Sequence, residues 1–382
     1  MRFIGNKENL IPQIYTILEK HNIIQDSKRF FDMFAGSSSV GRFFKAKGFS
    51  VYSCDLLYFS YCLQRAYLQN NALPCFKGLD ISSQSQNTRD LFASNYQKLL
   101  AFLNDIQPKQ GFIYQNYAPS GTLDLANPRM YFSDENAMQI DAIRLQIEVW
   151  KKEGAINEDE YFILLATLIE SVSFYANVAG VYAAFCKTWD KRALKTFALK
   201  ELNLLQSAQE CFCYCGDSVD ILESLKYKTF DILYLDPPYN ARQYAPNYHL
   251  IETIARYDNP NIKGIAGLRE WQQQKSQFCN AKTALNALAK ILELKNYKYL
   301  VLSYNSEGLL QKEEIEKLLK QSLLKQDAKL HFEEIKYPRF KSNHNKGDKF
   351  IKEYLWILRK IRFLVMRFYV FCATMQVFIC GF

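Results

Sequence analysis

The segment ILYLDPPYN, residues 232–240, places an acid, two prolines and an aromatic directly after an apolar run. The carboxylate of Asp236 and the carbonyl of Pro237 are both hydrogen-bond acceptors, and together they can hold the two hydrogens of an amino group. Pro237 and Pro238 lack backbone N–H groups, and their rings fix φ, so the Pro237 carbonyl keeps its direction. Tyr239 offers a flat face on which an extruded base can stack, a contact worth about 1–3 kcal/mol.

This arrangement suits the transfer of a methyl group to an exocyclic amino nitrogen. The amino group of adenine is a poor nucleophile because its lone pair is delocalised into the ring, and acceptors on both amino hydrogens draw that pair out of conjugation. A methyl group on a sulfonium is already activated, so the main task is alignment and no metal is required. A strand end before a proline-rich turn is the simpler alternative, but it explains only one of the two prolines.

A second segment, FDMFAGSSSVGRFF at residues 31–44, predicts a strand, a tight glycine turn and the start of a helix. The next strand ends on Asp55, nineteen residues after Gly36. A carboxylate at that place can accept hydrogen bonds from the diol of a ribose. NAD is disfavoured, because Ser38 stands where the close approach of a pyrophosphate needs a glycine. S-adenosylmethionine has no phosphate and tolerates a looser turn, so it is the predicted cofactor.

The elements that must position these groups are visible as an alternation of strands and helices. Helical patterns, such as the one at 283–294, lie between apolar runs that predict strands. The predicted strands are 29–34, 49–55, 210–217, 230–236, 297–304, 330–338 and 353–358. This alternation predicts an α/β fold with a Rossmann-like, doubly wound sheet.

Residues 79–208 interrupt the alternation and are mostly helical in pattern. One amphipathic helix is predicted to begin at Ser133, whose side chain can cap it, and a largely buried helix follows within 160–180. We therefore expect an insertion between two strands, which divides the catalytic domain into residues 1–78 and 209–358.

The ten cysteines and the net charge indicate the cellular location of the protein and the kind of partner that it binds. In the run CFCYC, Cys211, Cys213 and Cys215 share one face of a predicted strand, which suits buried small side chains, and no CxxC pair or nearby histidine completes a zinc site. The N-terminus lacks a cleavable signal pattern, so reduced thiols and a cytoplasmic location are expected. The net charge of +9 predicts a polyanionic partner, with nucleic acid favoured over a membrane surface.

A third segment, RFIGNK at residues 2–7, precedes the other two in the sequence, and the order of the three is informative. In order, the three segments resemble the Dam-like, alpha-class adenine DNA methyltransferases, in which a (Y/F)-x-G-x-K element precedes an FxG turn and DPPY follows a target-recognition insert. They stand here as Phe3-Ile4-Gly5-Asn6-Lys7, Phe34-Ala35-Gly36 and Asp236-Pro237-Pro238-Tyr239. The resemblance covers roughly residues 1–358.

The resemblance implies a site-specific enzyme that methylates the 6-amino group of adenine in duplex DNA with S-adenosylmethionine, after flipping the base out of the helix. It leaves a separate restriction endonuclease open as a partner. The implied catalytic residues are Asp236, Pro237, Pro238 and Tyr239. The implied cofactor-binding residues are Phe3, Gly5, Lys7, Asp32, Phe34, Gly36, Asp55 and Asp217. For Asp217, a solvated acid is the alternative to a contact with the adenine edge of the cofactor.

DNA contacts are expected from two basic segments, 187–200 and 337–349, and from the loop that follows DPPY. Contacts to phosphates make binding strongly dependent on salt. The candidates are Lys187, Lys191, Arg192 and Arg339 for phosphates, and Tyr244 and Tyr248 for closing over the base. Solvated basic surfaces and tyrosines that pack against the sheet are the alternatives. Sequence recognition is assigned to the insert, residues 79–208.

Two other functions stay open. Methylation of the 4-amino group of cytosine presents the same chemistry, although cytosine enzymes of this type usually carry serine where Asp236 stands. A catalytically silent DNA-binding protein is the alternative from another class. The apolar tail, residues 359–382, is marginal in length for a membrane span, which needs about 20 apolar residues. An appended segment is favoured over a membrane anchor.

Overall fold

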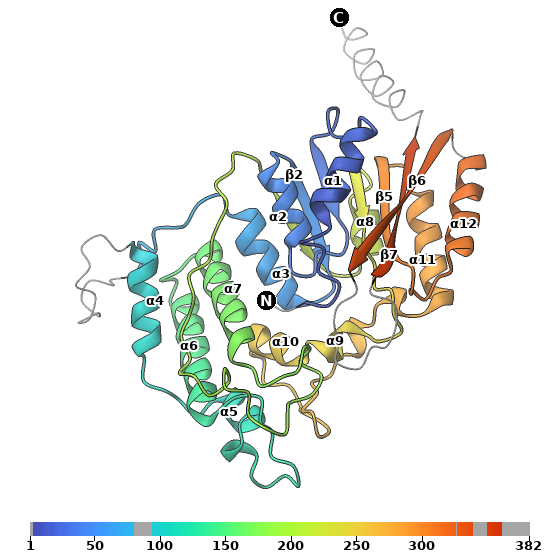
Figure 1. Ribbon diagram of the computed structural model, residues 1–382. Coiled ribbons are helices and arrows are strands. Elements are labelled where there is room, and N and C mark those ends of the chain that lie inside the picture. Colours follow the sequence, from blue (N-terminus) through green and yellow to red (C-terminus); the bar gives the residue numbers. More distant parts are fainter. Residues whose placement is uncertain (1–2, 80–93, 326, 339–349, 361–382) are drawn as a thin grey trace, which may run out of the picture.

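A seven-stranded sheet and a group of helices form two lobes of the protein (Figure 1). The computed structural model describes residues 3–79, 94–325, 327–338 and 350–360. Arg339, one of the DNA-contact candidates, and residues 361–382 of the apolar tail lie outside the described residues. No helix within the described ranges is long and apolar enough to cross a membrane.

The sheet has the strand order β3-β2-β1-β4-β5-β7-β6. Strands β1 to β5 run parallel, and β7 is antiparallel to both β5 and β6. Each predicted strand is confirmed, with small changes at its ends. The bounds are β1 (Arg29–Asp32), β2 (Ser50–Asp55), β3 (Phe212–Cys215), β4 (Phe230–Leu235), β5 (Tyr297–Asn305), β6 (Ala328–Pro338) and β7 (Phe350–Lys360).

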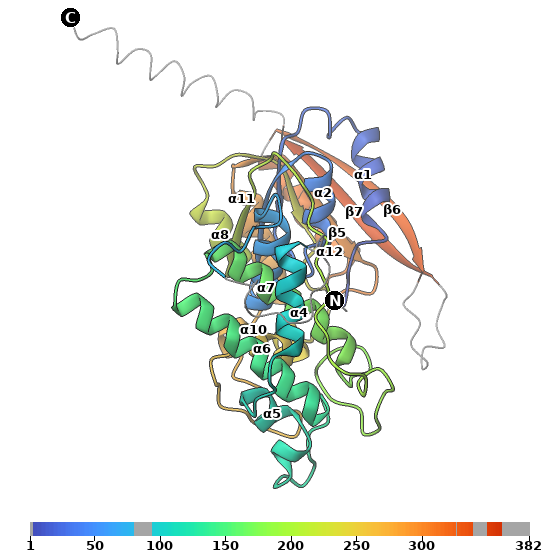
Figure 2. The same ribbon diagram turned by 90° about the vertical axis from the view of Figure 1, so that its left-hand side faces the viewer.

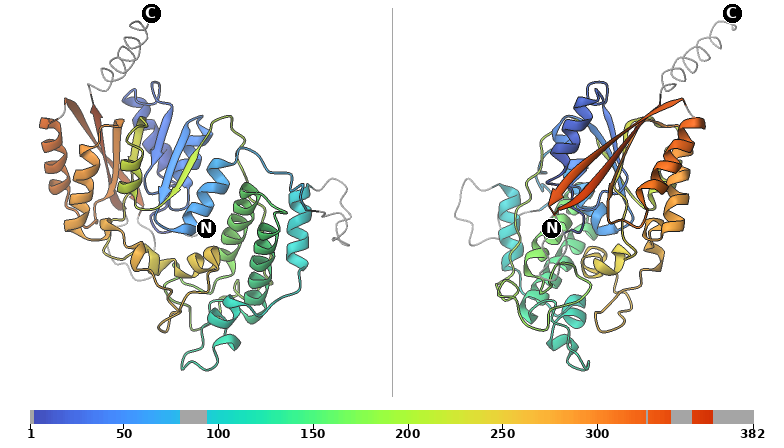
Figure 3. Two further views of the ribbon diagram at one scale, coloured as in Figure 1. Left: turned by 180° about the vertical axis from the view of Figure 1, so that it is seen from behind. Right: turned by 45° about the vertical axis from the view of Figure 1, so that its right-hand side comes forward.

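Helices cover both faces of the sheet, which confirms the doubly wound α/β prediction (Figure 3). One face packs against α1 (Ile11–Lys20) and α2 (Ser39–Ala46); the other packs against α8 (Ser218–Ser224), α11 (Ala281–Glu293) and α12 (Lys312–Lys325). Successive side chains of a strand point to opposite faces of the sheet, so each strand contributes residues to both layers. In β1, Phe30 packs toward α2 with its ring centroid 3.7 Å from that of Phe44, while Phe31 belongs to the opposite face.

The helical lobe has a core of its own and lies below the sheet lobe in the view of Figure 2. Ser133 and Asn157 accept hydrogen bonds from backbone N–H groups at the starts of α6 and α7, so the predicted cap at Ser133 is confirmed. The helices are α3 (Tyr58–Gln64), a π-helical turn (Arg65–Gln69), α4 (Asn95–Asp105), α5 (Phe112–Tyr117), α6 (Asp134–Lys152), α7 (Glu158–Tyr175), α9 (Tyr244–Asn247) and α10 (His249–Arg256). Short 3-10 turns span Ser120–Thr122, Gln272–Gln274 and Gln277–Cys279.

Segments from three parts of the chain share this helical core. Helices α4 to α7 lie between β2 and β3 in sequence, as expected for an insertion, but α3 precedes residue 79 and α10 follows β4. Residues 57–67 and 245–255 contribute side chains to the same buried cluster. The lobe that adjoins the sheet is therefore larger than residues 79–208.

The order of the strands determines where a ligand can bind. From β1 the sheet continues in one direction through β2 and β3, and in the other through β4 and β5. Ligands of open α/β sheets bind at such a reversal, beyond the carboxyl ends of the strands. Asp55, Asp217 and Asp236 all follow the carboxyl ends of parallel strands, so they lie at the same edge of the sheet.

The cysteines of the CFCYC run are not uniformly buried. Cys211 is buried and Cys213 is half-buried, but Cys215 is exposed. The prediction that all three are buried is wrong for Cys215, because β3 is an edge strand with a neighbour on one side only.

Candidate active site

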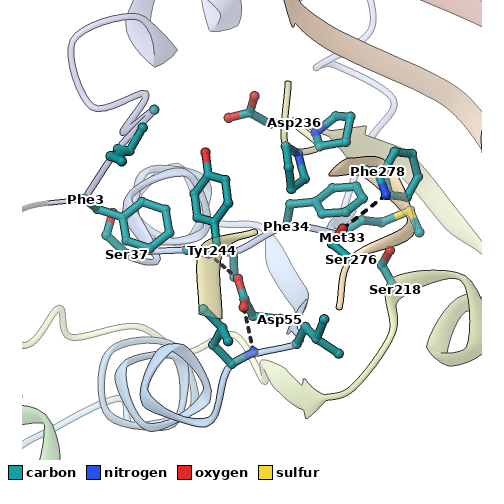
Figure 4. Close-up of a pocket in the computed structure, with 18 of the residues that line it drawn as sticks. Phe3, Met33, Phe34, Ser37, Asp55, Ser218, Asp236, Tyr244, Ser276 and Phe278 are labelled. Carbon is teal, nitrogen blue, oxygen red and sulfur yellow. Dashed lines mark hydrogen bonds between the residues drawn. The ribbon is translucent and has the colours of Figure 1, made fainter. Parts of the chain in front are cut away.

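A single pocket spans the carboxyl ends of β1 to β4 (Figure 4). It encloses about 910 Å³ of empty space, its open mouth included. Among the residues that line it are Phe3, Gly5, Lys7, Phe34, Gly36, Asp55, Asp217, Asp236, Pro237, Pro238, Tyr239 and Tyr244. The structure thus brings together all predicted catalytic residues and all predicted cofactor residues except Asp32.

The glycine turn after β1 is anchored by Asp55. Gly36 has a φ of +51°, a left-handed conformation that glycine adopts without a steric penalty. Its N–H donates to Asp55 Oδ2 at 2.8 Å, and the N–H of Leu57 donates to Asp55 Oδ1 at 2.9 Å (Figure 4). Burial raises the pKa of Asp55 to about 6, against these hydrogen bonds, which lower it. At neutral pH the pocket therefore carries an ionised carboxylate beside the turn.

The N-terminal segment lies over the same turn. A Cβ atom on Gly36 would lie only 2.6 Å from the ring of Phe3, so this close approach also requires glycine. Phe3 stacks on Tyr248 with ring centroids 4.9 Å apart, and the Tyr248 hydroxyl accepts a hydrogen bond from the N–H of Ile4 at 2.7 Å. Of the two tyrosines proposed to close over a base, Tyr248 is fully buried in this packing, and Tyr244 lines the pocket.

Ser38 occupies a left-handed conformation at the start of α2, with a φ of +63°. Its hydroxyl is buried, and no hydrogen-bond partner for it exists among the described residues. A non-glycine residue in this conformation destabilises the folded state by about 1–2 kcal/mol. A glycine at this position would remove that strain, but its greater freedom in the unfolded chain would offset about 0.4–1 kcal/mol of the stability gained.

We expect Ser38→Gly to raise the free energy of unfolding by about 1 kcal/mol, because it relieves the backbone strain and removes the unpaired hydroxyl. Urea denaturation measures the change. Ser39→Gly is the matched control, since Ser39 is the first residue of helix α2 and should give no gain. A Ser38→Gly protein that is less stable than the wild type would contradict the strain argument.

Asp236 is half-buried and lies next to two buried charged residues. Lys7 Nζ is 3.2 Å from Asp236 Oδ1 and 2.7 Å from Oε1 of Glu353, a residue of β7. Burial raises the pKa of Asp236 to about 7, with Lys7 opposing this change and Glu353 adding to it. Burial lowers the pKa of Lys7, but the two carboxylates outweigh it and hold that pKa above its ordinary value. Asp236 lies above Asp55 in the view of Figure 4, and the two carboxyl groups are well separated there.

The loop after Asp236 is held from both sides. The carbonyl of Tyr239 accepts a hydrogen bond from the N–H of Leu309 at 2.9 Å. On the other side, a Cβ atom on Gly5 would lie 3.4 Å from the ring of Tyr239 and 3.7 Å from the hydroxyl of Tyr244. The N-terminal segment and two tyrosines therefore meet next to the acceptor groups of Asp236 and Pro237.

Two predicted cofactor residues have structural partners. Asp32 is 1% exposed and does not line the pocket; the N–H of Phe34 donates to its Oδ1 at 3.4 Å. Burial is the main reason that the pKa of Asp32 is raised to about 8. Asp217 lines the pocket, caps α8 through the N–H of Val219 at 2.9 Å, and accepts from Gln277 Nε2 at 3.3 Å. Asp32 can therefore affect cofactor binding only indirectly, by holding the turn after β1.

The loop before α11 provides one wall of the pocket that was not predicted from the sequence. Gln243 and Ser276 exchange two hydrogen bonds, of 3.1 and 2.8 Å, which hold this loop against the segment after DPPY. Phe278 packs edge to face on Phe34, with ring centroids 5.0 Å apart. Gln274 also lines this wall. These residues belong to no short motif, and no periodic pattern identifies them.

The basic candidates for DNA contact lie apart from the pocket. Lys187 and Lys191 are exposed, whereas Arg192 is half-buried and forms an ion pair with Asp190. None of these three residues lines the pocket. Within the described part of the chain there is no group of three or more His, Cys, Asp and Glu side chains that could hold a metal ion.

The chain is similar to known DNA methyltransferases. A family model described as D12 class N6 adenine-specific DNA methyltransferase matches residues 3–318. The Type II methyltransferase M.FokI of Planomicrobium okeanokoites is 39% identical over 360 residues, which are 94% of this chain and 53% of the relative. The modification methylase StsI of Streptococcus sanguinis is 32% identical over 363 residues, 94% of this chain and 52% of the relative.

A third relative is matched along its whole length. The Type II methyltransferase M.NlaIII of Neisseria lactamica is 36% identical over 369 residues, which are 94% of this chain and 99% of the relative. The chain thus spans about half the length of the first two relatives and nearly all of the third. On these matches, the chain belongs to the family of D12 class N6 adenine-specific DNA methyltransferases.

Proposed function

We propose that this chain transfers a methyl group from S-adenosylmethionine to the 6-amino group of adenine in duplex DNA. The observation that carries the proposal is the common pocket of Asp236, Tyr239 and Asp55 at the reversal of strand order. Membership in an adenine-specific family favours adenine over cytosine, and it disfavours a silent DNA-binding protein.

The residues present fit the proposed cofactor. Asp55 carries an ionisable carboxylate at the end of β2, where it would hold the ribose, and Asp217 would approach the adenine edge. Phe3, Phe34 and Gly36 line the pocket at the turn after β1. Gly5 and Lys7 line it next to Tyr239 and Asp236. When bound, S-adenosylmethionine supplies a methyl group activated by its sulfonium.

The protein's part in the reaction is to orient and polarise the target base. Asp236 and the Pro237 carbonyl would accept hydrogen bonds from the two amino hydrogens, and Tyr239 would stack on the ring. A nitrogen that accepts the methyl group would have to release one of its protons. Asp236, with a pKa of about 7, would receive it before it passes to water.

This role predicts a dependence on pH. Below its pKa of about 7, the carboxyl group of Asp236 is protonated, so it is a weaker acceptor for the amino group and cannot take up its proton. Methylation rates should therefore rise about tenfold between about pH 6 and about pH 8, while Lys7 remains charged throughout. Single-turnover rates with saturating cofactor and DNA measure this change. A flat profile over the range would contradict the role of the ionised carboxylate.

The remaining assignments concern DNA and partners. We propose that the catalytic domain comprises residues 1–78 and 209–358, and that the insert at 79–208 recognises the DNA sequence. Lys187, Lys191, Arg192 and Arg339 would contact phosphates, and Tyr244 would contact the flipped base. The names of the relatives support a role in restriction-modification. We propose a separate restriction endonuclease as a partner. DNA as the substrate supports a cytoplasmic location.

The test is expression of the full chain in a host that lacks adenine methylation, followed by sequencing that maps modified bases across the genome. We expect N6-methyladenine within one recurring short sequence. Methylation of cytosine instead, or no modified base despite folded protein, would overturn the proposal.

A further inference from the structure

Glu353 is a buried acidic residue on β7, an inner strand of the sheet. It lies on β7, which pairs with β5 on one side and β6 on the other, opposite Asn305 and Ile335. It is 2% exposed, and the residues that follow it on β7, from Leu355 to Leu358, are buried and apolar. A carboxylate in such a place is costly unless it is paired and hydrogen-bonded.

The contacts of Glu353 lead directly to the reaction site. Its Oε1 accepts hydrogen bonds from Lys7 Nζ at 2.7 Å and from the hydroxyl of Ser303 at 2.6 Å. The same Lys7 Nζ lies 3.2 Å from Asp236 Oδ1. The four side chains thus form one series from β5 through β7 and the N-terminal segment to the DPPY loop. The family model ends at residue 318, so Glu353 lies beyond the part of the chain that it matches.

The balance of charge suggests what Glu353 does. The buried carboxylate of Glu353 and the half-buried carboxylate of Asp236 share one ammonium group, and the shorter contact is to Glu353. If Glu353 were neutral, Lys7 would be drawn fully to Asp236 and would compete with the target amino group for its oxygens. Other titratable groups that face this set are Asp32 on β1, Tyr234 on β4, Tyr239 in the loop after β4, and Tyr244 at the start of α9.

We propose that Glu353 is a positioning residue for methyl transfer: it holds Lys7 away from full pairing with Asp236, so that an Asp236 oxygen remains available to the amino group. This inference rests on the proposed function. Ser303 takes part by donating to the same oxygen of Glu353, which fixes the carboxylate in place.

The first test is Glu353→Gln in the full chain. We expect kcat to fall by about 10–100-fold, the loss associated with one hydrogen bond to a charged group, while KM for cofactor and DNA changes little. Glu334→Gln is the matched control, because Glu334 pairs with Lys352 at 2.9 Å on the same hairpin, yet is exposed. The control should keep wild-type kcat, and the thermal midpoints of both variants show whether folding is affected.

The second test separates positioning from support of the fold. Lys7→Met leaves Asp236 and Glu353 as two neighbouring carboxylates without a cation, which favours uptake of a proton by one of them. Adding Glu353→Gln removes that conflict, and the double variant should be more active than Lys7→Met alone. A purely structural role predicts instead that the two losses add.

The outcomes distinguish this inference from the function on which it rests. If the wild-type chain methylates no adenine, the proposed function fails and the inference fails with it. If the wild type is active but Glu353→Gln has wild-type kcat, or the double variant is no more active than Lys7→Met, the inference alone is overturned.

Discussion

Asp236→Asn should lower kcat for adenine methylation by about 10²–10⁴-fold, the usual contribution of a positioned proton acceptor. The substitution keeps the size of the side chain, but it removes the negative charge and replaces one acceptor oxygen with a donor. The amino group then loses one of its two acceptors, and its lone pair remains in the ring. Single-turnover kinetics with a duplex containing the mapped target sequence measures the loss.

Binding of the cofactor should survive this substitution, because Asp55, which accepts a hydrogen bond from Gly36, lies apart from Asp236 in the pocket (Figure 4). Calorimetry with S-adenosylmethionine checks this. Asp231→Asn is the matched control: Asp231 lies on the same strand, β4, and accepts from the N–H groups of Lys28 and Arg29 outside the pocket. An Asp236→Asn protein with wild-type kcat would remove Asp236 from the mechanism.

Asp55→Asn is expected to have the opposite signature, a weaker cofactor complex with kcat largely retained at saturating cofactor. The two carboxylate oxygens of Asp55 accept hydrogen bonds from the backbone N–H groups of Gly36 and Leu57. The side-chain NH2 group of an asparagine would therefore face one of these backbone N–H groups. The variant also offers a poorer acceptor to a ribose. The loss of hydrogen bonds to a charged group, about 1.5–3 kcal/mol, corresponds to a dissociation constant about 10–100-fold higher.

Calorimetric titration with S-adenosylmethionine measures this constant directly. Asp220→Asn is the control, since Asp220 is an exposed acid in the first turn of α8 and does not line the pocket. A dissociation constant for Asp55→Asn within twofold of the wild-type value would exclude Asp55 as a cofactor ligand.

The seven strands and the Gly36–Asp55 spacing were predictable because they depend on local order. A two-residue period defines a strand, and a helix between two strands makes them parallel. Parallel strands bring their carboxyl ends to one edge, so Asp55, Asp217 and Asp236 could be expected in one place before any coordinates were known. DPPY was informative for a similar reason, since its acceptors and prolines act within four consecutive residues.

Only the tertiary structure decided which distant side chains meet at that edge. Lys7 and Glu353 are 346 residues apart, and their contact depends on β7 lying between β5 and β6. The loop with Ser276, and the burial of Tyr248 but not Tyr244, likewise follow from how the two lobes pack. Sequence periodicity specifies the face on which a side chain lies, but strand order, register and the packing of loops bring partners together. Asp236 was therefore evident from the sequence, whereas the charges that control it were not.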